Sequence, residues 1–298
     1  MVDISIIIPH KNSSKLLERL LKSIPSSINA QVLVIDDNSR VEECKSLETL
    51  SKTYSFELYK NNDGLGAGAA RNVGLEYAKG DWLMFADADD FYLDSLNDKF
   101  NQYKESDYDI IFFDVNSCYS DTLEPAYRDE HIKSIASKYL RTKDEGYLRY
   151  NYLAPWGKLI RQSLLADNYI DFENIIAGND MMFSVKSGLA AKTICYDSTP
   201  IYMLTLSAGS ITTTLTKDRF DSRLKATLRI NKLLRGNNQS EFQASVLYFL
   251  AKAHQFGLRY MLNVIFMCVK HRANIFIGFN KIGGYKKIIQ NRQNTTVK

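Results

Sequence analysis

Five short apolar segments recur through the first 115 residues, and polar or amphipathic segments with helical spacing separate most of them. The apolar segments cover residues 3–9, 31–36, 56–60, 82–86 and 108–116. Short β-branched runs of this kind predict buried strands. Strands that alternate with helices predict a mostly parallel sheet with helices on both faces. This alternation limits the first half of the chain to an α/β, Rossmann-like fold.

Acidic residues directly follow two of these predicted strands. Asp36 and Asp37 come after the second strand, and Asp87, Asp89 and Asp90 come after the fourth. In open α/β sheets, ligands bind outside the carboxyl ends of the strands. We therefore expect these carboxylates to leave the core at the ligand-binding edge of the sheet.

Asp87, Ala88 and Asp89 form an Asp-x-Asp motif. Two carboxylates held close together repel each other unless a cation lies between them. Oxygen ligands favour Mg²⁺ or Mn²⁺, which keep coordination positions open for phosphate oxygens. The alternative is an acidic turn that caps a helix starting near Asp94. The motif on its own is a weak signal for either.

Other interpretations of the acidic and glycine-rich segments fit less well. A calcium-binding loop fails because Phe91 and Tyr92 stand where an oxygen ligand and a glycine are needed. A phosphatase of the haloacid-dehalogenase type would place its nucleophilic aspartate after the first strand, whereas Asp87 follows the fourth. The segment 64–69, "GLGAGA", matches the dinucleotide-binding pattern but follows a weak strand. The neighbouring Arg71 is more informative, because a cation beside a glycine-rich loop can pair with phosphate.

The charge is distributed unevenly along the chain. Residues 217–298 hold 16 Lys and Arg and three acids, a net charge of +13, so residues 1–216 carry −9 of the total of +4. The segment 246–269 is apolar almost all round but too short in its uncharged part to span a bilayer. We expect a basic helical region that associates with an anionic membrane surface, with plain helical packing as the alternative. A nucleic-acid binder would need exposed aromatic residues on a recognisable motif, and none is present.

The cysteines and the N-terminus favour a reducing compartment. Cys44, Cys118, Cys195 and Cys268 are far apart and form no C-x-x-C pair, which argues against a zinc site or a disulfide framework. The first residues show no secretory signal pattern. We expect a cytoplasmic protein, peripheral on the inner face of the cell membrane.

Taken in order, several segments resemble the family 2 glycosyltransferases of the GT-A fold. They are "SIIIPHKNSSKLLERLLKSI", "VLVIDDNS", "GAARNVGLEYAKGDWLMFADADDF", "PWGKLIRQSLL", "GNDMMFSVKSGL" and "PIYMLTLSAGSIT". The resemblance extends from Asp3 to about Thr213. It implies a GT-A domain at 1–216, with a nucleotide-binding half at about 1–115 and an acceptor half at about 116–216. The basic helical region at 217–298 lies beyond it.

The resemblance also implies roles for individual residues. Asp180 matches the catalytic base, Asp89 and Asp87 match the metal site, and Trp156 would border the donor sugar and the acceptor. The remaining implied residues would contact the nucleotide: Pro9 and His10 in the first loop, Asp36 or Asp37 at the uracil, Asp63, Gly66 and Arg71 beside the glycine-rich loop, and Ala88 with Asp87 near the ribose.

Three positions depart from the family pattern. His10 stands where the family usually has Tyr, and Asn179 replaces the Glu that precedes the catalytic Asp. The segment 202–205, "YMLT", lacks the basic residue of the family's Y-x-Y-R. Asn179 removes any assistance from a second acid, and the segment 202–205 offers no cation to the diphosphate.

The resemblance implies an inverting glycosyltransferase that uses Mn²⁺ or Mg²⁺. The donor would be a nucleotide-sugar, most often a UDP-sugar, and the acceptor a saccharide hydroxyl. The basic tail fits a lipid-linked acceptor of the kind used in O-antigen or capsule polysaccharide assembly. Because of Asn179 and His10, a non-catalytic module that binds sugar nucleotides stays open as the alternative.

Overall fold

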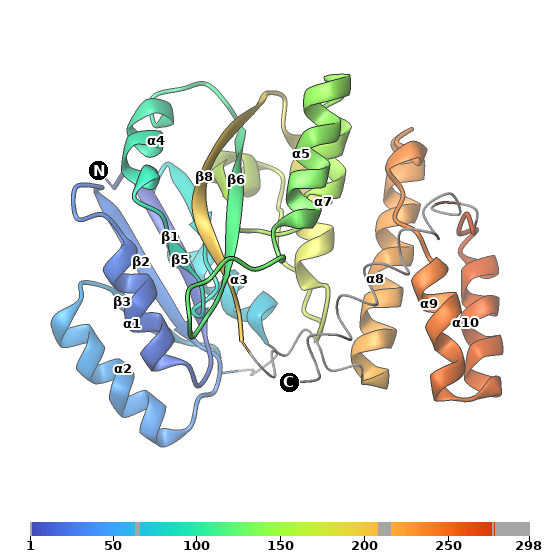
Figure 1. Ribbon diagram of the computed structural model, residues 1–298, viewed down its shortest axis with the longest axis horizontal. Helices are drawn as coiled ribbons and strands as arrows, with labels where there is room; N and C mark the ends of the chain where they lie inside the picture. Colours follow the sequence, from blue (N-terminus) through green and yellow to red (C-terminus); the bar gives the residue numbers. More distant parts are fainter. Residues whose placement is uncertain (1, 63–65, 208–215, 276, 278–298) are drawn as a thin grey trace. The chain divides into compact units, whose positions relative to one another are not determined.

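The computed structural model describes residues 2–62, 66–207, 216–275 and 277. The chain divides into two compact units, Met1–Leu215 and Thr216–Lys298. The first unit contains the sheet, which Figure 1 shows, and the acidic residues Asp36, Asp37, Asp87, Asp89 and Asp90. The second consists of helices in its described part.

An eight-stranded sheet organises the first unit. Its strands are β1 (Ile4–His10), β2 (Ala30–Asp36), β3 (Glu57–Lys60), β4 (Trp82–Phe85), β5 (Phe91–Tyr92), β6 (Ile110–Tyr119), β7 (Lys158–Arg161) and β8 (Ile194–Leu206). They lie in the order β3-β2-β1-β4-β7-β6-β8-β5. The pairs β1/β2, β1/β4, β2/β3 and β6/β8 are parallel, whereas β7 runs antiparallel to β4 and β6, and β5 antiparallel to β8. The predicted mostly parallel sheet is confirmed.

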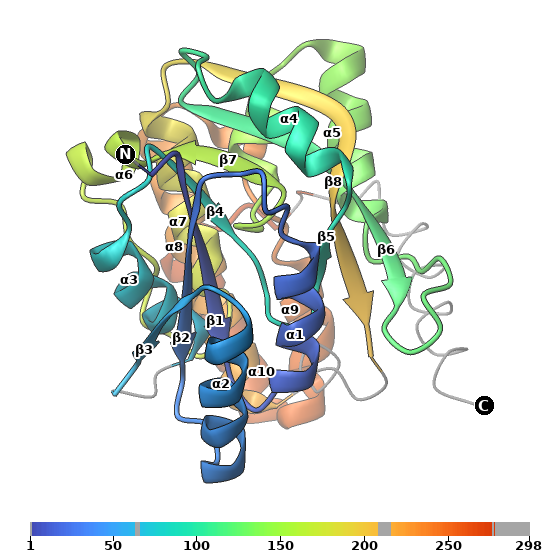
Figure 2. The same cartoon turned by 90° about the vertical axis from the view of Figure 1, so that its left-hand side faces the viewer.

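Helices cover both faces of this sheet, as predicted. They are α1 (Ser14–Ser23), α2 (Val41–Thr53), α3 (Ala67–Tyr77), α4 (Ser95–Tyr103), α5 (Glu130–Thr142), α6 (Gln162–Asp167) and α7 (Asn179–Ala190), with a π-helical turn at Tyr147–Asn151. Figures 1 and 2 show α1, α2 and α4 on one face, and α3 and α7 on the other. The turn at Tyr147–Asn151 packs against α7.

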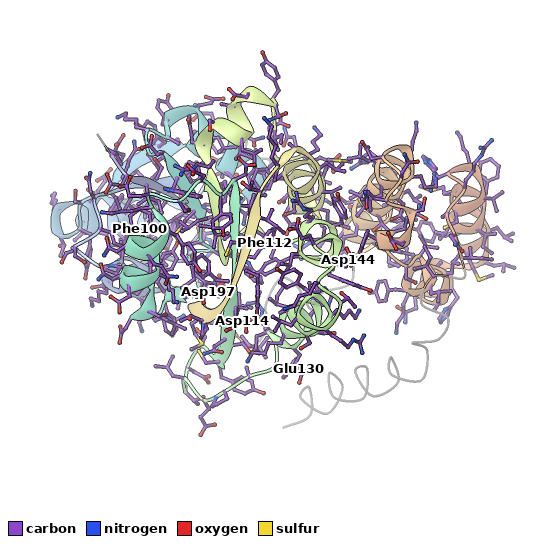
Figure 3. The ribbon with its side chains drawn as sticks, turned by 90° about the horizontal axis from the view of Figure 1, so that it is seen from above. Phe100, Phe112, Asp114, Glu130, Asp144 and Asp197 are labelled. Atoms are coloured by element: carbon purple, nitrogen blue, oxygen red, sulfur yellow. The ribbon has the colours of Figure 1, made fainter. Side chains whose placement is uncertain are left out.

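The central strands are apolar on both sides because both faces of the sheet are covered. Ile6, Ile7 and Ile8 of β1 are fully buried. Figure 3 shows side chains filling the layers beside the sheet, among them Phe100 of α4 and Phe112 of β6, which are each 1% exposed. Gly80 lets the chain pass close to β1, because a Cβ there would lie 2.4 Å from the Ile4 carbonyl carbon.

Several elements of the first unit were not predicted, and helix α5 and strand β8 are the longest of them. Helix α5 lies within the segment 121–146, in which the sequence shows no clear period, yet Ile132, Ile135 and Ala136 are buried at helical spacing. Exposed lysines and polar residues on its other faces obscured that spacing. Strand β8 was also missed, because its first half mixes polar and apolar residues and its unbroken apolar run is confined to 201–204. Its pairing with β6 supplies the missing signal.

The second unit contains α8 (Lys217–Gly236), α9 (Leu247–Lys252) and α10 (Leu258–Lys270), with short 3₁₀ turns at Ser240–Phe242 and Ala253–Phe256. Phe220 and Leu224 of α8 pack in one buried cluster with Val264 and Cys268 of α10. The apolar segment 246–269 is divided at Gly257, which has φ +97°. Within the described residues, every helix is too short or too polar to cross a bilayer. The remainder of the predicted helical region, 278–298, lies outside the described residues.

Candidate active site

The loop that follows β4 gathers three carboxyl groups. Asp87, Asp89 and Asp90 each offer an oxygen, and these oxygens lie within 4.8 Å of one another. Burial and the charge of Asp87 raise the pKa of Asp89. Burial and the charges of Asp89 and Asp87 raise the pKa of Asp90 well above its ordinary value. A bound cation would reverse this repulsion, so the group fits a divalent metal ion by charge and ligand type.

Hydrogen bonds within the protein occupy Asp90. It is fully buried, its Oδ2 accepts a hydrogen bond from the Tyr202 hydroxyl at 3.1 Å, and its Oδ1 accepts one from the Thr205 backbone N–H at 2.7 Å. The Tyr202 hydroxyl also accepts a hydrogen bond from the backbone N–H of Asp87 at 2.9 Å. Asp90 therefore attaches the loop to β8, which leaves Asp87 and Asp89 as the carboxylates that fit a metal.

Asp89 is held through its backbone. Its carbonyl oxygen accepts a hydrogen bond from Arg19 Nη2 at 2.6 Å and another from the Thr205 hydroxyl at 2.7 Å. Arg128 also lies near this loop. Its Nη1 is 4.0 Å from Asp90 Oδ1 and donates a hydrogen bond to the Thr205 carbonyl oxygen. These contacts fix the backbone of the motif without using the Asp89 carboxylate. Arg128 also brings a cation to the segment 202–205, which lacks one in its own sequence.

Arg71 joins the acidic loop to α7. Its guanidinium is buried and forms an ion pair with Asp87, with Nη2 2.5 Å from Oδ1. Nη1 donates to Asn179 Oδ1 at 3.3 Å, and the guanidinium carbon lies 5.3 Å from the centre of the Phe172 ring. Arginine suits this position because its planar group donates in two directions at once. Asn179, which replaces the family's Glu, thus takes part in positioning Arg71.

Asp180 lies in the first turn of α7, directly after the loop that ends at Gly178. Gly178 has φ +78°, a conformation that favours glycine. Burial raises the pKa of Asp180, and the positive charges of Arg71 and Lys158 oppose that rise. The charge of Asp87 also acts on it, so Asp180 belongs to the same group of charges as the acidic loop. A half-buried carboxylate with a raised pKa is suited to accept a proton.

Lys158 is a buried amine beside this group that the sequence did not single out. It is 3% exposed, and its Nζ donates to the Tyr152 carbonyl at 2.7 Å. Its Nζ lies 4.7 Å from the centre of the Tyr152 ring. Burial lowers the pKa of Lys158 to about 7, and the charge of Asp180 opposes that decrease. A lysine within the apolar strand segment "GKLI" was the available sequence signal.

Trp156 is linked to the acidic loop indirectly, through an aromatic contact with Tyr202. Its ring stacks on Tyr202, with centres 5.9 Å apart and planes 15° from parallel. Gly157, next to it, has φ +67°, and a Cβ there would lie 2.3 Å from the Tyr152 hydroxyl. Tyr202 therefore connects Trp156 with Asp87 and Asp90. The sequence did not identify Tyr202, although its segment was part of the family resemblance.

The first loop is held by a buried histidine. His10 is 1% exposed, and its Nδ1 lies 3.2 Å from Asp36 Oδ1. Its Nε2 accepts a hydrogen bond from the backbone N–H of Ser13 at 3.2 Å, so Nδ1 carries the proton and donates to Asp36. Burial lowers the pKa of His10. His10 and Asp36 thus hold one another inside the protein, next to the half-buried Pro9.

Asp37 connects the end of β2 with the glycine-rich loop. Its Oδ1 accepts hydrogen bonds from Asn61 Nδ2 at 2.7 Å and from the Gly66 backbone N–H at 3.3 Å. Its Oδ2 lies 3.2 Å from the half-exposed Lys11 Nζ. Gly66 has φ +90° and precedes α3. Asp63 and residues 64 and 65 lie outside the described residues.

The structure arranges the predicted residues in two sets. The first contains Asp87, Asp89, Arg71, Asp180 and Trp156, joined by the ion pair, the aromatic stack and the shared charges described above. The second joins Pro9 and His10 of the first loop to Asp36 and Asp37 at the end of β2 and to Gly66 of the glycine-rich loop. Ala88 is buried between the two aspartates of the motif. The residues that sequence reasoning missed are Tyr202, Thr205, Arg19, Arg128 and Lys158, which all act through hydrogen bonds or burial.

The family model for Glycosyl transferase family 2 matches residues 5–168, which is more than half of the chain. The putative glycosyltransferase EpsH of Bacillus subtilis is 22% identical over 248 residues, 80% of this chain and 71% of EpsH. The poly(ribitol-phosphate) β-N-acetylglucosaminyltransferase TarS of Staphylococcus aureus is 29% identical over 213 residues. That alignment covers 68% of this chain but 35% of TarS, so the chain spans about a third of this relative.

Solved structures share the fold. Residues 1–349 of S. aureus TarS in complex with UDP-GlcNAc superpose with a TM-score of 0.60 at 22% identity, over 77% of this chain and 66% of that one. The mannosyltransferase PcManGT of Pyrobaculum calidifontis, solved with GDP-Man and Mn²⁺, gives 0.55 at 14% identity, over 98% of this chain and 82% of that one. These likenesses agree with the GT-A architecture of the first unit. With the match to the family model, they identify the chain as a member of glycosyl transferase family 2.

Proposed function

We propose that the protein transfers a sugar from a nucleotide-sugar, with UDP as the nucleotide, to an acceptor hydroxyl with inversion at the anomeric carbon. The observation that carries this proposal is the gathering of Asp87, Asp89, Arg71 and Asp180 between the end of β4 and the start of α7. TarS, a family relative, was solved with UDP-GlcNAc, which supports the choice of donor class.

In this proposal, residues 1–115 bind the nucleotide and 116–216 supply the acceptor side. Of the two acids at the end of β2, Asp37 is the better candidate for contacting the uracil of the nucleotide. Its Oδ2 pairs with the half-exposed Lys11, whereas Asp36 is bound to the buried His10 and to Ser39. His10 then positions Asp36 and Pro9 rather than contacting the donor itself. Asp63 and Gly66 would line the nucleotide beside Asp37.

Asp87 and Asp89 would hold Mg²⁺ or Mn²⁺. The third carboxylate of the loop, Asp90, is less suitable, because both of its oxygens accept hydrogen bonds from β8. When bound, the ion supplies electrostatic stabilisation of the diphosphate leaving group. Arg71 orients Asp87 through their ion pair. The complex of PcManGT with GDP-Man and Mn²⁺ supports this assignment, since it pairs the same fold with a divalent ion and a nucleotide-sugar.

Asp180 would act as the general base. It takes the proton from the acceptor hydroxyl while the acceptor oxygen bonds to the anomeric carbon and the bond from that carbon to the diphosphate breaks. The pKa of Asp180, raised by burial, favours proton uptake. Trp156 would present its ring to the sugar, since it stacks on Tyr202 beside the acidic loop.

The acceptor in this proposal is a saccharide, with a lipid-linked sugar of surface polysaccharide assembly favoured. The support is the net charge of +13 on residues 217–298, which suits an anionic membrane surface on the cytoplasmic side. O-antigen and capsule are two such assemblies, and the poly(ribitol-phosphate) on which TarS acts adds a polyol-phosphate polymer as a third class.

The substitution Asp180→Asn tests the catalytic assignment. We expect the variant to bind UDP as the wild type does, and to release UDP from a UDP-sugar roughly 10²- to 10⁴-fold more slowly, the usual contribution of a general base. Asp171→Asn, an exposed carboxylate in the loop before α7, is the matched control and should change neither quantity. Calorimetry measures binding, and a coupled assay measures UDP release in the presence of Mn²⁺.

Two outcomes would contradict the proposal. Full turnover by Asp180→Asn would assign the base to another residue. UDP binding without any release of UDP from a panel of UDP-sugars by the wild type, with or without saccharide acceptors, would favour the non-catalytic binding module.

A further inference from the structure

Helix α10 exposes a continuous apolar stripe. The stripe consists of five large side chains that are 41–69% exposed: Leu258, Leu262, Ile265, Phe266 and Val269. Their spacing of four, three, one and three residues places them on one side of an α-helix, within an arc of about 100°. We call these residues the α10 stripe.

The stripe is not the side of α10 that packs in its own unit. Val264 and Cys268 are 0% and 1% exposed and join the buried cluster around Phe220 and Leu224 of α8. The helix is therefore apolar on two sides, one covered and one exposed. Contiguous exposed apolar side chains of this size mark an interaction surface.

Basic residues border the α10 stripe, and α10 contains no acid. Arg259 and Lys270 are exposed and follow Phe266 around the helix, and Arg272 comes directly after its end. The whole region 217–298 holds three acids, Asp218, Asp221 and Glu241, all before α9. An apolar stripe bordered by cations matches the boundary between anionic headgroups and acyl chains. An apolar partner protein would also fit the stripe, but such a partner would not explain the cations at its border.

We propose that α10 docks flat on an anionic lipid surface, with the α10 stripe inserted among the acyl chains and Arg259, Lys270 and Arg272 at the headgroups. The inference rests on the membrane association in the proposed function and assigns it to one surface. The helix has 13 residues, about 20 Å at the usual rise, which suits a position in the interface.

Vesicle binding tests this surface. Wild type and variants are sedimented with phosphatidylcholine vesicles that contain or lack phosphatidylglycerol, at low and high salt. The test variant is Leu262→Ser with Phe266→Ser, whose side chains are 57% and 62% exposed. The matched control is Val41→Ser with Leu123→Ser, 67% and 56% exposed in the first unit. A third variant, Arg259→Gln with Lys270→Gln, removes charge from the border.

We expect wild type and the control to bind the phosphatidylglycerol vesicles, and the Leu262/Phe266 variant to bind at least about tenfold more weakly. The Arg259/Lys270 variant should lose most of the salt-sensitive part of binding. Thermal melting and UDP binding, which do not involve the stripe, should be equal in all four proteins. Equal melting shows that the loss is not a loss of folding.

Three results would overturn the proposal. The first is equal vesicle binding by wild type and the Leu262/Phe266 variant. The second is no binding of wild type to anionic vesicles, with a concentration-dependent dimer that the Leu262/Phe266 variant loses, which would assign the stripe to a second copy of the chain. The third is no vesicle binding by wild type at either salt concentration, without such a dimer. Release of UDP from a UDP-sugar in solution is measured separately, so a failure of docking and a failure of the enzymatic proposal give different results.

Discussion

At the scale of single residues, the hydrogen-bond and ion-pair partners of each acid define the site. Three acids follow β4, and their roles differ because of their hydrogen-bond partners. Asp90 is bound by Tyr202 and Thr205, Asp87 by Arg71, and Asp89 is held by its backbone carbonyl. The sequence predicted that these acids lie at the edge of the sheet. It could not distinguish them, because the distinction depends on side chains and backbone groups of α1, α3 and β8 that only the fold brings to the loop.

Tyr202→Phe is predicted to destabilise the first unit by about 1–3 kcal/mol, since it leaves the Asp87 N–H and the buried Asp90 carboxylate without the shared hydroxyl. The ring and its stack on Trp156 stay in place. Denaturant unfolding measures the change. Tyr169→Phe is the control, because that side chain is 89% exposed, and its stability should equal that of the wild type. A Tyr202→Phe protein as stable as the wild type would show that the hydroxyl does not hold the loop.

Lys158 should impose a pH dependence on stability. Burial lowers its pKa in the folded protein from 10.5 to about 7, so between these values the unfolded chain binds more protons. The free energy of unfolding should therefore rise with pH through this window, with a limiting slope of about 1.4 kcal/mol per pH unit. Lys158→Met removes the ionisable group and should remove this contribution.

The difference between wild type and Lys158→Met, measured by denaturant unfolding at several pH values from 7 to 9, isolates this contribution. Lys52→Met changes an exposed lysine on α2 and should leave the slope of the wild type unchanged. An identical slope in Lys158→Met and wild type would contradict a buried, largely neutral amine at position 158.

At the scale of elements, close backbone contacts position α7 and therefore Asp180. A Cβ at Gly188 of α7 would lie 2.2 Å from the carbonyl oxygen of Arg149 in the π-helical turn. Arg149 in turn donates to the carbonyl oxygens of Gly188 and Ala191 at 3.0 and 2.6 Å. This contact lies toward the far end of α7 from Asp180, so it fixes the helix whose first turn carries the proposed base.

Gly188→Ala should destabilise the protein by about 1–3 kcal/mol, the usual cost of forcing an extra methyl into a packed contact, despite the better helix propensity of alanine. Gly236→Ala provides the comparison, because a Cβ there meets no atom within 4 Å and the change should be neutral or stabilising. Thermal unfolding of both variants measures the effect. Equal melting temperatures would mean that α7 and the turn can separate without cost.

The sequence predicted the elements whose own residues show a clear hydrophobic pattern. It did not predict those that depend on contacts with distant segments. The apolar runs of β1, β2 and β4 were predicted because each is buried on both faces, a property visible in the run itself. Helix α5 was missed because Ile132, Ile135 and Ala136 form a narrow buried stripe among polar residues. The antiparallel strand β7 was not predicted, because it has four residues and its direction depends on its partners β4 and β6.

At the scale of the whole molecule, the two units carry different chemistry. Met1–Leu215 holds the sheet and the charged site of a family 2 glycosyltransferase, and Thr216–Lys298 holds a basic helical region with the exposed α10 stripe. The contrast in net charge between them was readable from composition alone. The stripe was not, because an apolar sequence does not tell which of its residues a neighbouring helix covers.

The central claim is that Asp87 and Asp89 hold a divalent ion together with a nucleoside diphosphate. Calorimetric titration of UDP into wild type, Asp89→Ala and the control Asp94→Ala, each with Mn²⁺ and with EDTA, tests it most directly. We expect UDP to bind wild type and Asp94→Ala at least about tenfold more tightly with Mn²⁺ than with EDTA, and Asp89→Ala equally weakly in both. Mn²⁺-dependent UDP binding by Asp89→Ala at the affinity of the wild type would contradict the claim.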